Sequence, residues 1–134
     1  YVGNYYGTPK KYVEEQLNEG KDVILEIEIQ GALQIKKKFP EALLLFVTTP
    51  NAEVLINRLK GRGTESIDVI NKRLRRAVEE SEGIDEYDYL IVNDVLDDCV
   101  IRMHNIIQNS KYYANKNTKF INEFRSELSE LTKE

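Results

Sequence analysis

The sequence predicts an α/β domain in which helices flank a parallel sheet. Three stretches rich in β-branched or other apolar residues alternate with stretches whose apolar residues recur every three or four positions. The predicted strands cover residues 22–29, 43–48 and 87–92. Residues 43–48 are apolar on both faces, which is typical of a parallel strand covered by helices on both sides. Three strands are few for this class, so we expect the sheet to be incomplete or to be completed by another chain.

The predicted helices begin and end at residues with capping or breaking preferences. Thr8 and Pro9 favour the start of a first helix, which Gly20 ends. Further helices are expected over residues 32–38, 51–60, 66–81, 93–114 and 118–131. Ser66 is expected to cap one of them, and Asn93 with Asp94 to cap another.

The last predicted helix, residues 118–131, has one apolar face. Its apolar residues recur at helical spacing, and they are Phe120, Phe124, Leu128 and Leu131. Left exposed, these side chains would form an apolar patch. We therefore expect this helix to dock on the body of the protein or on a second copy.

Composition and charge restrict the classes of function. The chain has 134 residues, of which 41% are apolar and 31% are charged, enough for one domain with a core. The formal net charge of −4 argues against duplex nucleic acid as a partner, because such binders usually carry a basic face. Small anions need only a local cluster of cations. No run approaches the roughly 20 apolar residues of a membrane span, so no membrane role is expected.

Cys99 is the only cysteine, so no internal disulfide can form, and we expect a cytoplasmic location. Its place in a helical pattern beside Val100 favours a packing role over that of a nucleophile.

The chain starts at Tyr1 rather than Met, and no signal peptide is visible. We expect it to be a piece of a longer protein.

The first candidate site is the segment 3–8, with the sequence GNYYGT. A tyrosine hydroxyl such as that of Tyr6 can donate a hydrogen bond to a phosphate oxygen, and the Thr8 hydroxyl can bind a base edge. The alternative is that the aromatic side chains only pack within a loop. The segment by itself favours that alternative.

The second candidate site is the pair Glu26 and Glu28 near the end of the first predicted strand. Alternation along a strand places both carboxylates on one face. Open α/β sheets bind ligands at the carboxyl ends of their parallel strands, and a carboxylate there can hold Mg²⁺ or its waters. A solvated edge strand is the alternative of equal weight.

The third candidate site is a set of arginines, namely Arg58, Arg62 and Arg73, with Arg75 and Arg76 nearby. Gly61 and Gly63 flank Arg62, and such a glycine-hinged loop can close over a polyphosphate. Guanidinium groups match phosphate oxygens and stabilise charge on a transferring phosphoryl group. An exposed pair of charged helices is the alternative, and the flanking glycines favour the functional interpretation.

In this order, these segments resemble the guanylate kinase family. The matching segments are 3–8 (GNYYGT), 20–31 (GKDVILEIEIQG), 58–65 (RLKGRGTE), 71–74 (NKRL) and 87–94 (YDYLIVND). Each motif is modest, but five in register are highly specific, and together they cover roughly residues 1–110. The resemblance implies a parallel sheet of the P-loop nucleoside monophosphate kinase type, with flanking helices. It also implies transfer of a phosphoryl group from ATP to GMP, giving ADP and GDP.

The resemblance implies roles on the GMP side of the site. Tyr6 would contact the GMP phosphate, and Thr8 would bond the guanine base. Glu28 would face the guanine end of the nucleoside. Glu26 would lie near the water shell of Mg²⁺.

On the ATP side, the resemblance places Arg58 and Arg62 in a lid that closes over the ATP phosphates. Arg73 would bridge the donor and acceptor phosphates in the transition state, and Asn93 would lie beside the adenine. No side chain need act as a nucleophile, since positioning and charge do most of the work in phosphoryl transfer.

The sequence departs from the family pattern in three places. Position 28 is often Asp in the family, and Glu28 is one methylene longer, so its nucleoside contact is altered or bridged by water. The tail from about Asn115 lies outside the pattern. The glycine-rich phosphate loop is missing, together with the N-terminal arginines and the acid of the GMP site, and the family would place all of these before Tyr1.

The missing phosphate-loop strand would be central in this fold, between residues 22–29 and 43–48. Without it two strands lose a hydrogen-bonding neighbour, and unpaired strand edges recruit other strands. We expect the isolated chain to rearrange or to form a homodimer, unless the missing part is present in the sample. The expected domains are a partial guanylate kinase-like domain over residues 1–114 and a C-terminal amphipathic helix over residues 115–134.

Three hypotheses follow for function. In the first, the parent protein is a GMP kinase and this chain alone is inactive. In the second, the chain is a non-catalytic guanylate-kinase-like module that binds other proteins, although such modules typically lose basic residues that are present here as Arg58, Arg62 and Arg73. In the third, it is a truncated product without activity, or one that interacts through residues 120–131.

Overall fold

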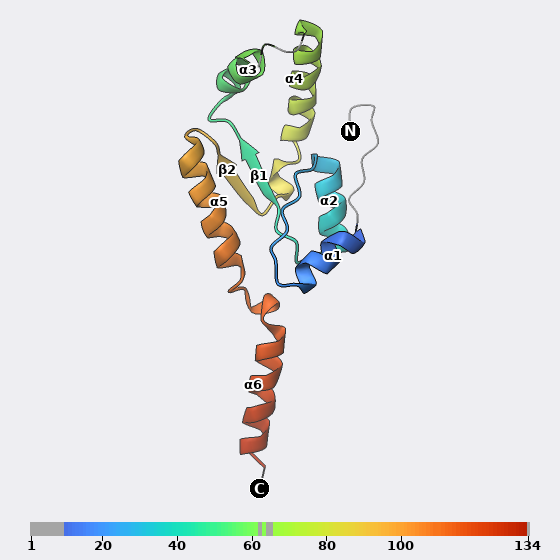
Figure 1. Cartoon of the computed structure of the whole chain (residues 1–134), viewed down its shortest axis with the longest axis vertical. Helices are drawn as coiled ribbons and strands as arrows, with labels where there is room; N and C mark the ends of the chain where they lie inside the picture. The colour runs from blue at the N-terminus through green and yellow to red at the C-terminus, as the bar shows by residue number, and fades with distance from the viewer. Residues whose placement is uncertain (1–9, 62, 64–65, 134) are drawn as a thin grey trace.

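The computed structural model describes residues 10–61, 63 and 66–133 (Figure 1). In chain order its elements are α1 (Lys10–Asn18), α2 (Ile29–Lys38), β1 (Leu45–Thr48), α3 (Ala52–Gly61), α4 (Ile67–Ser81), η1 (Ile84–Glu86), β2 (Tyr89–Val92), α5 (Leu96–Ser110), η2 (Ala114–Lys116) and α6 (Thr118–Leu131). The described part is therefore mostly helical, with one small two-stranded sheet.

The two strands pair in parallel, as the sequence predicted. Leu45 lies opposite Tyr89 and Thr48 opposite Val92, so both strands end at the same edge of the sheet. The chain passes from β1 to β2 through α3 and α4. Figure 1 shows α5 on one side of the strands and α2 on the other.

Several predicted helix boundaries are confirmed by their capping contacts. Gly20 ends α1 with φ of 82°, a left-handed conformation that glycine adopts without steric cost. Asn51 precedes α3, and its Oδ1 accepts a hydrogen bond of 2.9 Å from the Val54 amide. Ser66 caps α4, because its hydroxyl accepts a hydrogen bond from the Val69 amide. The bounds of α6 agree with the predicted helix at 118–131.

The predicted strand over residues 22–29 is wrong. The described structure has no regular element between Asn18 and Ile29, and the Ile24 side chain is 70% exposed. A strand exists only where a neighbour accepts and donates its backbone hydrogen bonds, and the described residues provide none beside this segment. In addition, α2 begins at Ile29 rather than at 32, because the Glu28 carboxylate caps it.

The predicted cap and extent of the helix after β2 are also wrong. The residue that precedes α5 is Val95, with no side-chain capping bond, and the helix ends at Ser110 rather than near 114. Asn93 and Asp94 instead remain in the connection, where their carbonyl groups bind another helix. Ala114 belongs to η2.

The apolar face of α6 does not dock on the body of the protein. Phe120 is 67% exposed and Leu131 is 82% exposed, and Phe124 and Leu128 are exposed as well. Phe120 and Phe124 stack on each other, with ring centroids 6.2 Å apart. In Figure 1 the helix extends away from the other elements. The expectation of docking on the body is thus wrong, and a second copy remains a prediction.

The buried apolar residues come from α2, α4, β2, α5 and the residue before β1. Among the described residues, the buried apolar side chains are Ile29, Ala32, Leu44, Ile70, Ile91 and Cys99. Cys99 is only 3% exposed, in line with the packing role expected for it. Gly83, just after α4, allows a very close approach, since a Cβ atom at this position would overlap the Ile29 side chain. The C-terminal end of α4 is thereby packed against the start of α2.

Asp88 joins three segments that are distant in the sequence. Its Oδ2 accepts hydrogen bonds from the Leu44 amide (2.8 Å) and from Lys36 Nζ (3.0 Å). Lys36 Nζ also donates to the Ala42 carbonyl at 2.6 Å. These contacts attach the end of α2 and the start of β1 to the residue that precedes β2.

Replacing Asp88 should therefore destabilise the fold. We expect Asp88→Ala to lower the free energy of unfolding by about 1–2 kcal/mol, because a half-buried backbone donor loses a charged acceptor while the partly exposed ion pair adds little. Urea denaturation of the 134-residue chain measures this change. Asp85→Ala, at a nearby exposed position, is the matched control and should leave stability within about 0.5 kcal/mol. Equal stability of both variants would contradict the assigned role.

Tyr87 lies half-buried beside the core, where its ring meets Phe46 edge to face at 5.1 Å. Burial raises the pKa of the Tyr87 phenol above its ordinary value, and the charges of Glu80 and Glu28 raise this pKa further. The folded state thus favours the protonated phenol. The resulting stabilisation is fully present below about pH 10 and is lost as pH rises through the raised pKa.

We expect Tyr87→Phe to reduce the loss of stability on the alkaline side of about pH 10, because phenylalanine keeps the ring contact and removes the titrating group. The free energy of unfolding, measured by urea denaturation from about pH 8 to about pH 11, tests this. Tyr112→Phe is the control, since Tyr112 is 84% exposed. Identical pH profiles for wild type and Tyr87→Phe would contradict the prediction.

Candidate functional site

The structure brings together two of the predicted ATP-site residues, Arg58 and Asn93. Arg58 lies near the end of α3, and its Nη1 donates a hydrogen bond of 2.8 Å to the Asn93 carbonyl. Its Nη2 donates to the Asp94 carbonyl at 3.3 Å. Asn93 follows β2 directly, and its amide donates to the Thr48 carbonyl at 2.7 Å. Arg58 therefore lies at the carboxyl edge of the parallel strands, the edge at which open α/β sheets bind ligands.

Arg58 has N–H donors left with which to bind an anion. A guanidinium carries five N–H donors in a planar fork, and the two carbonyl groups use only part of that set. The contacts fix the end of α3 against the end of β2. They place a permanent positive charge where a polyphosphate would meet the strand ends.

Arg73 lies on the exposed surface of α4, in the middle of the helix. α4 packs against α3, so Arg58 and Arg73 come from neighbouring helices. Arg62, which the sequence placed in the same group, lies outside the described residues, as do Tyr6 and Thr8.

The two predicted carboxylates are in different surroundings. Because residues 21–28 form no strand, Glu26 and Glu28 do not share a strand face as predicted. Glu26 is exposed. Glu28 caps α2, with its Oε1 accepting from the Gly31 amide at 2.6 Å and its Oε2 from the Gln30 amide at 2.8 Å.

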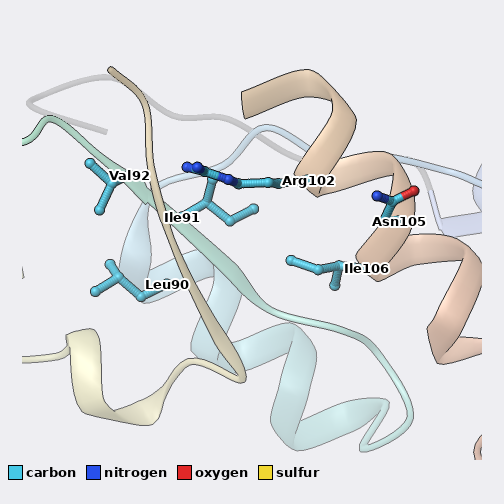
Figure 2. A pocket seen from close by; sticks show the side chains of 6 residues that line it. All are labelled: Leu90, Ile91, Val92, Arg102, Asn105 and Ile106. Carbon is cyan, nitrogen blue, oxygen red and sulfur yellow. The ribbon is translucent and has the colours of Figure 1, made fainter. Parts of the chain in front are cut away.

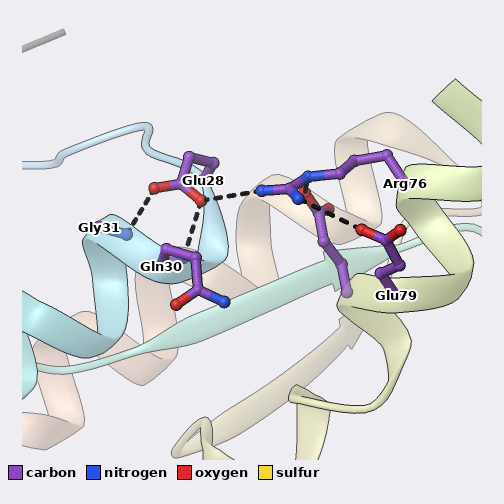
Figure 3. A network of polar contacts seen from close by, with 6 residues as sticks. Glu28, Gln30, Gly31, Arg76 and Glu79 are labelled. Carbon is purple, nitrogen blue, oxygen red and sulfur yellow. Dashed lines mark hydrogen bonds and ion pairs between the residues drawn. The ribbon is translucent and has the colours of Figure 1, made fainter. Parts of the chain in front are cut away.

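Figure 3 shows that the Glu28 carboxylate also faces Arg76 of α4, with Oε2 and Nη2 3.7 Å apart. Arg76 contacts two acids of its own helix, Glu79 at 3.3 Å and Glu80 at 3.2 Å. We call Glu28, Arg76, Glu79 and Glu80 the Arg76 cluster. Burial raises the pKa of the neighbouring Tyr87, and the charges of Glu80 and Glu28 raise this pKa further.

In the sequence, Arg76 stands out only as a neighbour of Arg73. The spacing of Arg76 to Glu79 and Glu80 is visible in the sequence as pairs three and four residues apart. The contact with Glu28 is not visible there, because it depends on how α2 and α4 pack.

In the part of the chain that the structure describes, no hydrogen bond or ion pair links Arg58 to Glu28. Arg58 and Asn93 thus form one polar group, and Glu28 belongs to another with Arg76. One is at the strand ends, and the other is between α2 and α4.

Two hollows lie elsewhere on the described surface. Figure 2 shows a hollow of about 370 Å³ beside β2 and α5, lined by Leu90, Ile91, Val92, Arg102, Asn105 and Ile106. A second, of about 470 Å³, lies between the end of α2 and η2, and Lys36, Asp88 and Lys116 are among its lining residues. None of the predicted site residues lines either hollow.

Over residues 10–61, 63 and 66–133, no three His, Cys, Asp or Glu side chains lie close enough together to hold a metal ion. Within the same ranges, every helix is too short or too polar to cross a bilayer.

Comparison with known proteins shows what the chain is similar to. The family model described as guanylate kinase matches residues 1–110. A guanylate kinase of Lactococcus lactis subsp. lactis is 51% identical over 116 residues, covering 87% of this chain and 57% of the relative. Guanylate kinases of Bacillus anthracis (52% over 107 residues; 80% and 52% covered) and of Listeria monocytogenes serovar 1/2a (49% over 108 residues; 81% and 53% covered) are similar to a like extent.

The chain spans about half the length of the curated relatives it matches. The match covers the segments from α1 to α5, and α6 follows the part that the family model covers. With a family model over residues 1–110 and relatives near half identity, this chain belongs to the guanylate kinase family.

Proposed function

We propose that the protein containing this chain transfers a phosphoryl group from ATP to GMP, giving ADP and GDP. The main support is that a chain near half identity to proteins named guanylate kinase has an arginine at the strand ends, Arg58, and another on the adjoining helix, Arg73. Both belong to segments that resemble the family. ATP and GMP are the proposed substrates, and no nucleic-acid partner is proposed.

On the GMP side, the proposal assigns the phosphate to Tyr6 and the guanine base to Thr8, both outside the described residues. Glu28 would face the guanine end of the nucleoside. Three contacts already involve its carboxylate, those with Gln30, Gly31 and Arg76. A carboxylate offers about four acceptor positions, so Glu28 has room for one direct or water-bridged contact.

On the ATP side, Arg58 and Arg62 would belong to the lid over the phosphates, and Asn93 would lie beside the adenine. The hydrogen bond from Arg58 to the Asn93 carbonyl supports a shared location for these two residues. Arg73 would neutralise the negative charge that passes between the donor and acceptor phosphates. Fixed cations of this kind speed phosphoryl transfer because they stabilise charge without having to reorganise.

Mg²⁺ is the proposed metal, with Glu26 near its water shell. Glu26 is exposed and could supply one carboxylate, which suits an ion that usually takes one or two carboxylates and completes its shell with waters and substrate phosphates. When bound, Mg²⁺ would neutralise charge on the phosphates of ATP.

The larger fold is also a proposal. We infer a P-loop nucleoside monophosphate kinase-like sheet in which a phosphate-loop strand, absent from these 134 residues, lies between β1 and residues 22–29. The support is that residues 22–29 are rich in β-branched side chains but have no strand neighbour in the described part of the chain.

The proposed domains remain residues 1–114 and 115–134. The proposed location is the cytoplasm, since Cys99 alone can form no internal disulfide.

The alternative function is a non-catalytic guanylate-kinase-like module that binds other proteins. The exposed apolar face of α6 favours an interaction surface, and a homodimer of the chain through this face or through an open strand edge is one form it could take. Arg58 and Arg73 favour the enzyme, because an interaction module has no need for cations arranged for phosphates.

Arg73→Met should separate the two functions in the longest natural protein that contains these residues. We expect kcat for GMP phosphorylation to fall at least about 100-fold, with a smaller change in KM, because the cation acts mainly on transition-state charge. A coupled assay of ADP release with ATP, GMP and Mg²⁺ measures this. Arg75→Met removes a charge from the same helix and should leave kcat within about twofold. An unchanged kcat in Arg73→Met would argue against the proposed role.

The 134-residue chain on its own should show no GMP kinase turnover above background. It contains no glycine-rich loop with the Lys and Ser/Thr that hold ATP phosphates, so ATP cannot be positioned. The same coupled assay tests this, and clear turnover would refute it.

The 134-residue chain should still bind GMP weakly through Tyr6 and Thr8. Titration calorimetry measures this binding, and heats identical to those of buffer would count against it.

A further inference from the structure

The Arg76 cluster has an unusual balance of charge. One guanidinium lies among three carboxylates, Glu28, Glu79 and Glu80, at 3.7, 3.3 and 3.2 Å. The Arg76 side chain is only 34% exposed, and those of Glu28 and Glu80 are each 22% exposed. Partly buried charges such as these are screened less by salt than fully exposed charges are. Without the arginine, the carboxylates would repel one another.

Capping alone does not explain a glutamate at position 28. The N-cap position of a helix prefers the shorter side chains of Ser, Thr, Asp and Asn. Glu28 makes the capping contacts, with Gly31 close enough that a Cβ atom there would lie 3.1 Å from Oε1. The extra methylene also lets the carboxylate extend from the start of α2 toward Arg76 on α4 (Figure 3).

In the same region, α2 and α4 also pack directly against each other. Gly83, at the end of α4, lies directly against the Ile29 side chain at the start of α2. The Ile29 side chain is buried at this contact. Arg73 precedes Arg76 by three residues, so the two arginines are neighbours on the surface of α4. The ion pair between Arg76 and Glu28 adds a polar contact to this packing of α4 against α2.

We propose that Arg76 is a positioning residue of the GMP site. It holds the Glu28 carboxylate at the start of α2, with one acceptor position left for the nucleoside, and it fixes α4 against α2. This inference rests on the proposed GMP kinase function, because it assumes that Glu28 faces the nucleoside.

The test compares Arg76→Gln with wild type in the longest natural protein that contains these residues, using the coupled assay of ADP release. We expect the KM for GMP to rise about three- to tenfold, since contacts between neighbouring side chains couple to this extent. The KM for ATP should stay within about twofold, because the ion pairs of Arg76 with Glu28, Glu79 and Glu80 involve no residue of the proposed ATP side. Arg75→Gln, which removes the same charge from the adjacent exposed position, should change neither constant.

Two further variants keep the test decisive. Arg76→Lys retains the charge but loses the planar fork, so it should raise the KM for GMP by about two- to threefold, and it replaces the Gln variant if that protein fails to fold. Glu28→Gln combined with Arg76→Gln should raise the KM for GMP no more than the more severe single variant does, because both act through one contact.

The outcomes separate the inference from the proposed function. If the wild-type protein does not phosphorylate GMP, the proposed function fails and the inference fails with it. If the wild type is active but Arg76→Gln or Arg76→Lys behaves like Arg75→Gln, only the inference is overturned. A variant that unfolds more readily but keeps both KM values also overturns it, since Arg76 would then be purely structural.

Discussion

The parallel pairing of β1 and β2 is the constraint on which the arrangement of the other elements depends. Because both strands run in the same direction and in the register of Thr48 with Val92, their carboxyl ends meet at one edge. The chain must then cross from one end of the sheet to the other between the strands, and α3 and α4 make this connection. The hydrogen bond from the Asn93 amide to Thr48 extends the pairing beyond the strand ends and places the Asn93 carbonyl within reach of Arg58. A pairing of only four residues thus decides where the arginines of the connecting helices can lie.

Charge is distributed unevenly around the two paired strands. At the strand ends, Arg58 donates to neutral carbonyl groups, so its positive charge is not cancelled and can attract phosphates. Between α2 and α4, acids outnumber the single arginine, and the raised pKa of Tyr87 reflects their field together with burial. In the proposed function, the positive region would face a polyphosphate and the acidic region would lie near a nucleoside.

The sequence predicted those features that depend on local chemistry. The extent of α6, the Ser66 cap and the Gly20 stop follow from side chains within a few residues of each boundary. Residues 22–29 have the composition of a strand, but strand formation needs a partner, and composition cannot supply one. The Arg58 contact with Asn93 and the Arg76 contact with Glu28 join residues far apart in the chain, so no spacing rule could reveal them. The roles of Tyr6, Thr8 and Arg62 came from family resemblance and concern residues beyond the described part.

α6 has a consequence for the behaviour of the chain in solution. α6 has 14 residues and an apolar face that is exposed in the described part of the chain, and its length is near that at which helices in water are only marginally stable. Its link to the rest passes through η2, where the Asn117 side chain donates to the carbonyl groups of Lys111 and Tyr113. Those local bonds can hold the direction of the helix, but they cannot prevent its unwinding. The tail should therefore exchange its amide protons far faster than α5, and a protease should trim it before it cuts α5.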